Sequence, residues 1–191
     1  ADWDKPYLTM NYEAEAIILK EFSKFFLSGS LYRGSKPVMW SPVEKTALAE
    51  AEIEYKDIKS TSIYVAFKVK SSSLLVAKDT SIIIWTTTPW TIPGNRAVAY
   101  GKDIDYSLFE VIECEDVQLQ SNKFIIADKL LQNVQEKCKI FKLNILKKFK
   151  GNDLKNTICT HPFLGKGYDF EVPLISGSFV EEGEGTGFVH I

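Results

Sequence analysis

Ile82-Ile-Ile-Trp-Thr-Thr-Thr-Pro-Trp-Thr-Ile-Pro-Gly-Asn95 is the stretch of this 191-residue chain that most restricts its fold. Its first four residues form a continuous apolar run of β-branched and aromatic side chains. Such a run predicts a strand buried on both faces, although a run this short is also compatible with a helix. Three threonines follow, and Pro89 then ends regular strand pairing. Because the last three residues form a strong turn signal, the sequence predicts a rigid strand that leads hydroxyl groups into a constrained loop.

The three consecutive threonines, residues 86–88, have two interpretations. Threonine is common in strands, and on residue type alone a threonine-rich strand end reflects only sheet propensity. The alternative is a ligand site, because clustered hydroxyls can hold a small polar molecule without carrying charge of their own. The order of the surrounding residues favours the second interpretation.

Residues 86–95, TTTPWTIPGN, resemble the threonine-rich peptide in the editing domain of the isoleucyl-tRNA synthetase family. The related valyl and leucyl families carry an arginine and an acidic residue around the same proline, where this chain has Thr88 and Trp90. Residues 36–55 also resemble the family, and residues 185–191, GTGFVHI, resemble the segment that closes its editing pocket. The resemblance spans nearly the whole chain, from residue 2 to residue 190.

Period-two alternation and frequent turn signals predict an α+β, mainly β fold. Many short strands separated by polar turns are typical of a barrel or sandwich, and the resemblance implies a β-barrel-like editing domain with peripheral helices. We expect a single editing domain, with residues 1–60 as a peripheral helix and connector and residues 61–191 as the main barrel with a short helix. The expected strands cover residues 62–69, 74–77, 81–88, 95–100, 106–113, 117–120, 123–127 and 138–149.

Two helices are expected at the periphery. In residues 11–28 apolar side chains recur at spacings of three and four, with Asn11 suited to the N-cap and Gly29 to termination. Its phenylalanines, Phe22, Phe25 and Phe26, are expected to be core residues that pack against one end of the sheet. A short second helix is expected over residues 128–137, with Asp128 as its cap.

Composition limits the possible partners and location. A formal net charge of −2 argues against a large nucleic-acid surface, because phosphate contacts dominate such binding, so any RNA contact should be local. The basic stretch 137–150 is more typical of a solvated strand face than of an RNA track. Three cysteines without a CxxC pair fit a reducing, cytoplasmic location. No apolar run approaches the ~20 residues that span a membrane, and the start of the chain indicates a fragment of a longer protein.

Metal and cofactor sites are not expected. Cys159 and His161 lie two residues apart, but two ligands without a second pair make a weak metal site. Some related synthetases bind zinc through cysteines that follow a tryptophan, whereas this chain has Ser41 and Glu44 at those positions, which predicts no zinc. The resemblance implies no cofactor in this domain, while the parent enzyme would use ATP and Mg.

The resemblance implies an aminoacyl-tRNA ester hydrolase that removes valine from mischarged tRNA, and possible activity on valyl-adenylate. Its expected partners are the tRNA 3′ end carrying valine and the rest of the synthetase, with the chain a monomer and no membrane contact. Thr91 and Asn95 would position the attacking water, and His190 would form the wall that excludes isoleucine. The implied substrate-binding residues are Thr86, Thr87, Thr88, Trp90 and His190.

Two alternatives remain at this point. One is a non-catalytic module that binds the aminoacylated 3′ end of tRNA, and the other is a valyl-tRNA synthetase editing domain that acts on threonyl esters. Neither an HxGH-type signature nor a KMSKS-like loop is present, so the chain is not expected to aminoacylate. In the family, an acidic residue that holds the α-amino group of the substrate lies just beyond residue 191.

Overall fold

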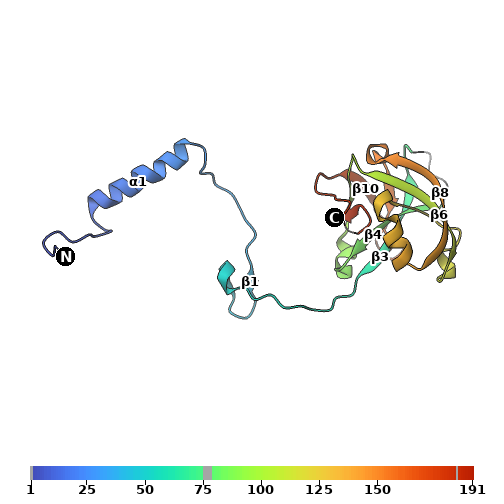
Figure 1. The fold of residues 1–191 in the computed structure, drawn as a ribbon, viewed down its shortest axis with the longest axis horizontal. Helices are drawn as coiled ribbons and strands as arrows, with labels where there is room; N and C mark the ends of the chain where they lie inside the picture. The colour runs from blue at the N-terminus through green and yellow to red at the C-terminus, as the bar shows by residue number, and fades with distance from the viewer. Residues whose placement is uncertain (1, 75–78, 184) are drawn as a thin grey trace. The chain divides into compact units, whose positions relative to one another are not determined.

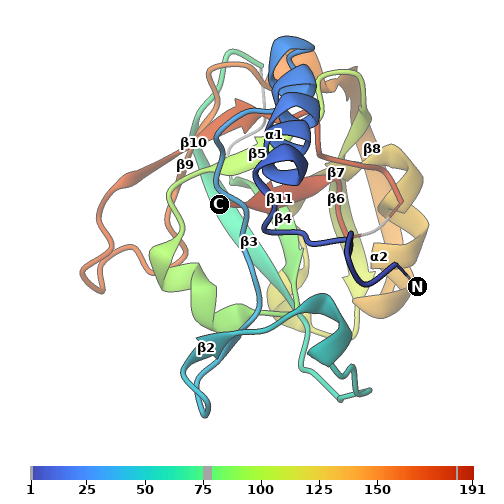
Figure 2. The same cartoon turned by 90° about the vertical axis from the view of Figure 1, so that its left-hand side faces the viewer.

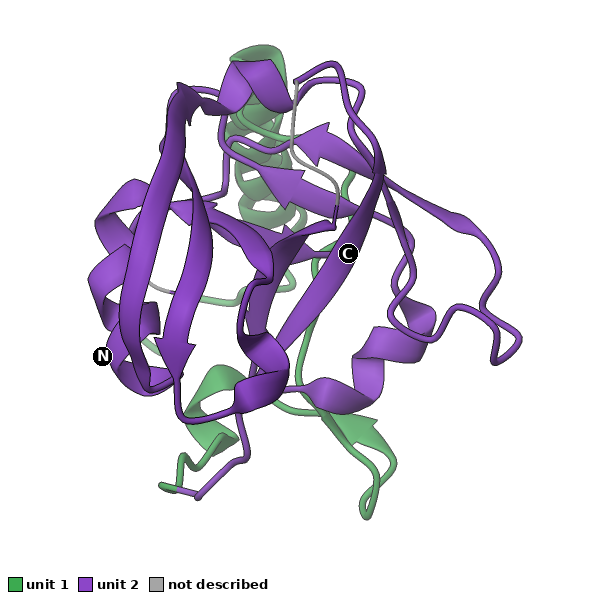
Figure 3. Ribbon diagram, turned by 90° about the vertical axis from the view of Figure 1, so that its right-hand side faces the viewer, with its two compact units in different colours: residues 1–57 green, residues 58–191 purple. Residues whose placement is uncertain are grey.

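The computed structural model describes residues 2–74, 79–183 and 185–191, and it divides into two compact units, residues 1–57 and 58–191 (Figure 3). The first unit contains one helix, α1 (Tyr12–Leu27), followed by a small hairpin and a 3-10 turn (Figure 1). The hairpin pairs β1 (Trp40–Ser41) with β2 (Thr46–Ala47), and the turn is η1 (Glu50–Glu52). Within the hairpin the Ser41 hydroxyl donates to the Glu44 carboxylate.

The helix α1 forms where the sequence predicts it. The Asn11 side chain caps its first turn by accepting from the Glu13 backbone N–H at 2.9 Å. The expectation that its phenylalanines are core residues is wrong, because Phe22, Phe25 and Phe26 are all exposed. No residue of α1 is buried, since the described part of this unit provides no second layer against which the apolar stripe could pack.

The second unit is built on a nine-stranded mixed sheet with the order β11-β5-β10-β9-β3-β4-β7-β6-β8. The pairs β4–β7 and β10–β5 are parallel, and the other neighbours are antiparallel; β10, β9 and β3 can be followed in Figure 2. The strands are β3 (Ile63–Ser71), β4 (Thr80–Thr86), β5 (Val98–Tyr100), β6 (Asp105–Cys114), β7 (Lys123–Ala127), β8 (Ile140–Lys150), β9 (Ile158–Thr160), β10 (Glu171–Ser176) and β11 (Phe188–His190).

This architecture confirms a mainly β fold with few helices, but it is not a closed barrel. Within the residues that the structure describes, the hydrogen-bonded order ends at β11 on one side and at β8 on the other. The sheet nevertheless curls, because β11 packs close to β4 although four strands separate the two in the order. "Barrel-like" therefore describes the curl of the sheet and not its hydrogen bonding.

Strand β4 is buried on both faces, as its apolar run predicts. Ile82 and Ile84 point into the larger core cluster, whereas Ile83 points into a second cluster with Phe109 and Val134. This follows from the position of β4 between β3 and β7, with side chains alternating between two covered faces. A strand held in this way gives the loop that follows it a fixed starting point.

Short helical elements connect the strands. They are η2 (Pro89–Gly94), η3 (Val117–Leu119), η4 (Asp128–Leu130), α2 (Leu131–Lys137) and η5 (Gly151–Leu154). The strand predicted at residues 117–120 is wrong: the Asp116 side chain accepts from the Gln118 N–H and so caps a 3-10 turn there. The strand expected at 74–77 falls almost entirely outside the described residues. None of the helices in the described segments is long and apolar enough to cross a membrane.

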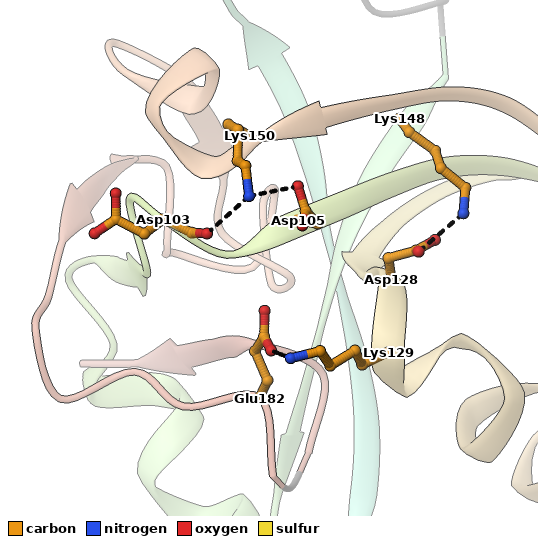
Figure 4. A network of polar contacts seen from close by, with 7 residues as sticks. All are labelled: Asp103, Asp105, Asp128, Lys129, Lys148, Lys150 and Glu182. Carbon is orange, nitrogen blue, oxygen red and sulfur yellow. Dashed lines mark hydrogen bonds and ion pairs between the residues drawn. The ribbon is translucent and has the colours of Figure 1, made fainter.

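The predicted helix at residues 128–137 is confirmed as η4 followed by α2, but the expected cap is wrong. The Asp128 carboxylate instead pairs with the Lys148 ammonium at 2.8 Å, as Figure 4 shows. It also accepts from the Ser107 hydroxyl. These two bonds hold the pKa of Asp128 below its usual value. Ser107 on β6 and Lys148 on β8 thus bind the carboxylate that the sequence predicts to cap a helix.

Ion pairs tie the edge strand β8 to its neighbours (Figure 4). Lys150 pairs with Asp105 at 2.8 Å and also donates to the Asp103 carbonyl oxygen, and Lys129 on η4 pairs with Glu182. These lysines are exposed, and water screens such pairs, so they contribute little to stability. In the basic stretch, Lys139, Lys148 and Lys150 are exposed and pair with Glu115, Asp128 and Asp105, as is typical of a solvated surface.

Candidate functional site

The site begins where β4 ends. Thr86 is the last residue of the strand and is buried, and its hydroxyl oxygen accepts from the Thr88 backbone N–H at 3.1 Å. This local bond turns the chain out of the sheet, as threonine hydroxyls often do at strand ends. It also brings the hydroxyl oxygens of Thr86 and Thr88 within 3.2 Å of each other.

The 3-10 helix η2 adds a third hydroxyl. Pro89 occupies its first turn, where the fixed φ of proline suits helical backbone and the missing N–H is not needed. The Thr91 backbone N–H donates to the Thr88 carbonyl oxygen at 3.0 Å, and the Thr91 hydroxyl donates to the same oxygen at 2.7 Å. The Thr91 hydroxyl oxygen therefore lies 3.4 Å from that of Thr88.

His190 completes the cluster from the far end of the chain. Strand β11 pairs with β5 and places His190 opposite Val98. Its Nε2 atom lies 3.3 Å from the Thr86 hydroxyl oxygen and 3.5 Å from that of Thr91. Partial burial lowers the pKa of His190, so the imidazole is neutral at physiological pH. The structure thus places two hydroxyls beside the neutral imidazole, and the Thr88 hydroxyl lies between those two.

The other three residues predicted for the site lie on the same loop but outside this cluster. Thr87 is exposed, and its carbonyl oxygen accepts from the Ser60 hydroxyl at 3.2 Å. The Trp90 side chain is 71% exposed. Asn95 is 1% exposed and donates its amide N–H to the Ala97 carbonyl oxygen at 2.8 Å, while its Oδ1 atom has no hydrogen-bond partner among the described residues.

The chemistry of this cluster is that of a neutral polar site. Hydroxyls can both donate and accept, and a neutral imidazole offers one donor and one acceptor. The arrangement can therefore orient a water molecule, an ester or a ribose hydroxyl. In a Ser/His/Asp triad Nε2 likewise contacts a hydroxyl, but a carboxylate orients Nδ1. Among the described residues the hydrogen bonds of His190 are to threonine hydroxyls and none is to a carboxylate.

Tyr106, which sequence reasoning did not single out, supports the strand that carries His190. Its buried hydroxyl accepts from the Gly101 N–H at 3.1 Å and donates to the Gly187 carbonyl oxygen at 2.7 Å. Gly187 has φ +78° and lies so close to β7 that an added Cβ would meet the Ala127 Cβ at 2.4 Å. The absence of a side chain at Gly187 thus permits this close approach to Ala127.

His161 has a structural role that its sequence context did not reveal. Its Nε2 atom lies 2.9 Å from the Ile92 carbonyl oxygen, and its Nδ1 atom accepts from the Phe163 backbone N–H at 3.1 Å. Both ring nitrogens are therefore engaged by the protein. Burial raises the pKa of the neighbouring Cys159 thiol to about 12, which disfavours the thiolate that a metal would need.

Sequence comparison identifies relatives along the whole chain. The family of class I tRNA synthetases (I, L, M and V) matches residues 1–160. The isoleucine–tRNA ligase of Pelagibacter ubique (strain HTCC1062) is 51% identical over 189 residues, which is 99% of this chain and 21% of that protein. The isoleucine–tRNA ligase of Gluconobacter oxydans (strain 621H) is 48% identical over 195 residues, covering 100% of this chain and 20% of that protein. The chain thus spans about a fifth of the length of these relatives.

Structural comparison gives the fold. The cytosolic leucyl-tRNA synthetase editing domain of P. knowlesi superposes with a TM-score of 0.51 and 13% identity, over 69% of this chain and 58% of that one. At 13% identity the similarity concerns the fold alone, and the fold that matches is that of an editing domain. Since the family match covers most of the sequence, this chain belongs to the class I tRNA synthetases (I, L, M and V).

Proposed function

We propose that this chain is the proofreading module of an isoleucine–tRNA ligase and hydrolyses valine from mischarged tRNA. The observation that carries the proposal is the cluster in which the Thr86 and Thr91 hydroxyls lie beside Nε2 of His190 and the Thr88 hydroxyl lies beside both of them. The relatives that match nearly the whole chain are isoleucine–tRNA ligases, which supports valine as the error to be corrected.

The need for such a module follows from the limits of binding. One missing methylene changes the free energy of binding by only about 1–3 kcal/mol. Discrimination of isoleucine from valine by isoleucyl-tRNA synthetase is the reference case for this range, which was not obtained from this chain. A synthetic pocket therefore accepts valine at an appreciable rate. An editing pocket reverses the selection, because it admits the smaller side chain and excludes the larger one by steric contact.

In the proposed mechanism, the protein positions the reactants and forms no covalent intermediate. An aminoacyl ester is already activated, so holding a water molecule against its carbonyl carbon can suffice. The threonine hydroxyls hold the aminoacyl group and the terminal ribose, and His190 forms the wall against the extra methyl of isoleucine. Because burial keeps the imidazole neutral, it does not repel the cationic α-amino group of the substrate.

The remaining loop residues have proposed roles at the edge of this pocket. Thr91 and Asn95 position the water; the Thr91 hydroxyl belongs to an exposed residue, whereas Asn95 is buried, with one amide N–H bonded to the Ala97 carbonyl oxygen and its Oδ1 atom without a hydrogen-bond partner among the described residues. The exposed indole of Trp90 offers a face on which an unpaired base of the tRNA end can stack. Thr87, which is exposed at the start of the same loop, is proposed to contact the aminoacyl group or the ribose together with its neighbours.

The test is deacylation of valyl-tRNA and isoleucyl-tRNA, both prepared on the isoleucine acceptor tRNA. We expect this chain, or a chain that continues about fifteen residues past Ile191 as in its relatives, to hydrolyse the valyl ester and to spare the isoleucyl ester. A threonyl ester included in parallel separates this activity from that of a valyl enzyme. Binding of a valyl-tRNA analogue without turnover by either chain would instead indicate a non-catalytic module.

A further inference from the structure

We propose that His161 is a positioning residue for the threonine loop, which it fixes through a hydrogen bond to the Ile92 carbonyl oxygen. The residue lies directly after β9 and is far from the loop in sequence. The effect of this hydrogen bond on hydrolysis rests on the proposed function, whereas its effect on the geometry of the loop does not.

The hydrogen bonds of His161 define its tautomer. The Phe163 backbone N–H can only donate, so Nδ1, which lies 3.1 Å away, must be the acceptor. In a neutral imidazole the proton then resides on Nε2. That N–H points at the Ile92 carbonyl oxygen 2.9 Å away, so His161 is the donor in the bond to the loop.

The loop needs such a partner. A six-residue 3-10 helix has poor hydrogen-bond geometry, and Pro93 inside η2 has no N–H to contribute. The Ile92 carbonyl oxygen accepts from the Asn95 backbone N–H at 3.0 Å, and His161 supplies its second donor. Thr91 precedes Ile92 in the same 3-10 helix, so we expect a shift of this turn to move the Thr91 hydroxyl, which lies 3.5 Å from Nε2 of His190.

An aromatic cage holds the His161 ring in one orientation. The ring stacks on Tyr168 with centroids 4.9 Å apart, and its centroid lies 5.1 Å from that of Phe170 and 5.6 Å from that of Phe163. The Arg96 guanidinium covers the outer side of Phe170 at 4.0 Å from the ring centroid. His161 is 1% exposed, so reorienting the ring would require the cage to open.

The test compares His161→Gln with His161→Asn. Both variants lose the ring and its packing, but the longer glutamine can place an amide N–H near the position of Nε2, whereas asparagine reaches only the position of Nδ1. Glutamine can therefore keep the bond to Ile92, whereas asparagine can keep only the acceptor for the Phe163 N–H, so the pair separates the two bonds of His161. The chain has two histidines, so His190 supplies the only imidazole NMR signal in either variant.

We expect the imidazole nitrogen shifts of His190 to match the wild type in His161→Gln and to differ in His161→Asn, because Thr91 moves only in the latter. If the chain hydrolyses valyl-tRNA, kcat should be at least about tenfold lower in His161→Asn than in His161→Gln, with KM similar, since small misplacements near reacting groups are costly. Equal behaviour of the two variants in both measurements would overturn the proposal.

A measurement on the wild-type chain keeps the proposal testable if either variant does not fold. Nitrogen NMR at neutral pH should show His161 as the Nε2–H tautomer, with a scalar coupling across the hydrogen bond to the Ile92 carbonyl carbon. The opposite tautomer would refute the proposal. Loss of the proposed hydrolytic function would appear as an inactive wild type and would leave this NMR result unaffected.

Discussion

At the scale of single residues, the two histidines show how environment sets chemical role. His190 is partly buried beside the Thr86 and Thr91 hydroxyls, and this burial lowers its pKa and favours the neutral ring. His161 is fully enclosed by aromatic rings, and both its nitrogens are bonded to backbone. The first is suited to contact a substrate and the second to hold a loop, although one ends a three-residue strand and the other directly follows one.

Replacing His190 tests its role as the wall of the pocket. We expect His190→Ala to hydrolyse isoleucyl-tRNA at a rate approaching that for valyl-tRNA, because the space of the imidazole admits the extra methyl group. Deacylation rates of the two esters measure this. Val189→Ala changes the neighbouring, exposed residue of β11 and should retain the preference for valine. If His190→Ala still spares isoleucine, His190 does not set the size limit.

The lowered pKa of His190 also predicts how stability depends on pH. Between its unfolded and folded pKa values the unfolded chain binds more protons at this residue, so its contribution is fully present above the unfolded value of about 6.5 and is lost as pH falls. We expect the free energy of unfolding to fall more between pH 7.5 and pH 5 in wild type than in His190→Gln. Urea titrations at several pH values measure this, and parallel curves would contradict it.

At the scale of elements, the turn before β11 places His190. Gly185 and Gly187 both have positive φ, and the Gly187 carbonyl oxygen is fixed by the Tyr106 hydroxyl. The Thr186 carbonyl oxygen accepts from the Ala127 N–H at 2.8 Å, which ties the same turn to the end of β7. The position of His190 therefore depends on the close approach of two backbones.

Gly187→Ala should be strongly destabilising. The left-handed conformation costs an alanine roughly 1–2 kcal/mol, and the contact of its Cβ with the Ala127 Cβ adds a further overpacking cost of about 1–3 kcal/mol. Urea denaturation should show the loss. Gly183→Ala is a matched control, because nothing lies within 4 Å of its added Cβ, and its midpoint should stay close to wild type. A small effect at Gly187 would indicate that the turn can move away from β7.

At the scale of the whole molecule, the two units differ in how they are stabilised. Every buried hydrophobic residue of the described chain lies between Phe67 and Phe188, within the second unit. The first unit has a capped helix and a short hairpin, and its large apolar side chains are exposed. We therefore expect residues 58–191 to account for the cooperative unfolding of the chain.

We expect a chain of residues 58–191 to unfold with a thermal midpoint within a few degrees of that of the full chain, because both core clusters are retained. Residues 1–57 alone should show only marginal helicity, since isolated helices of about this length are barely stable in water. Circular dichroism during heating measures both. Loss of cooperative unfolding in the shorter chain would show that the first unit is needed for the core.

Local sequence was sufficient for many elements and for the composition of the loop. The apolar run before Thr86 predicted β4, alternation predicted β3, and Asn11 predicted the start of α1, because each depends on contacts within a few residues. Local rules failed at residues 117–120, where the Asp116 cap outweighed strand propensity, and at Asp128, where Ser107 and Lys148 compete for the carboxylate. The exposed stripe of α1 shows that a pattern indicates an apolar face but not its partner.

By itself, the sequence determined the order of the motifs, the family resemblance and the neutral, hydroxyl-rich chemistry of residues 86–91. Only the tertiary structure decided that Thr86 and His190 meet, that β4 runs parallel to β7, and that His161 bonds to Ile92. The physical reason is that these contacts join residues 43 to 104 positions apart in the chain. They depend on strand register, sheet curl and burial, which are settled by the packing of the whole unit and not by any local pattern.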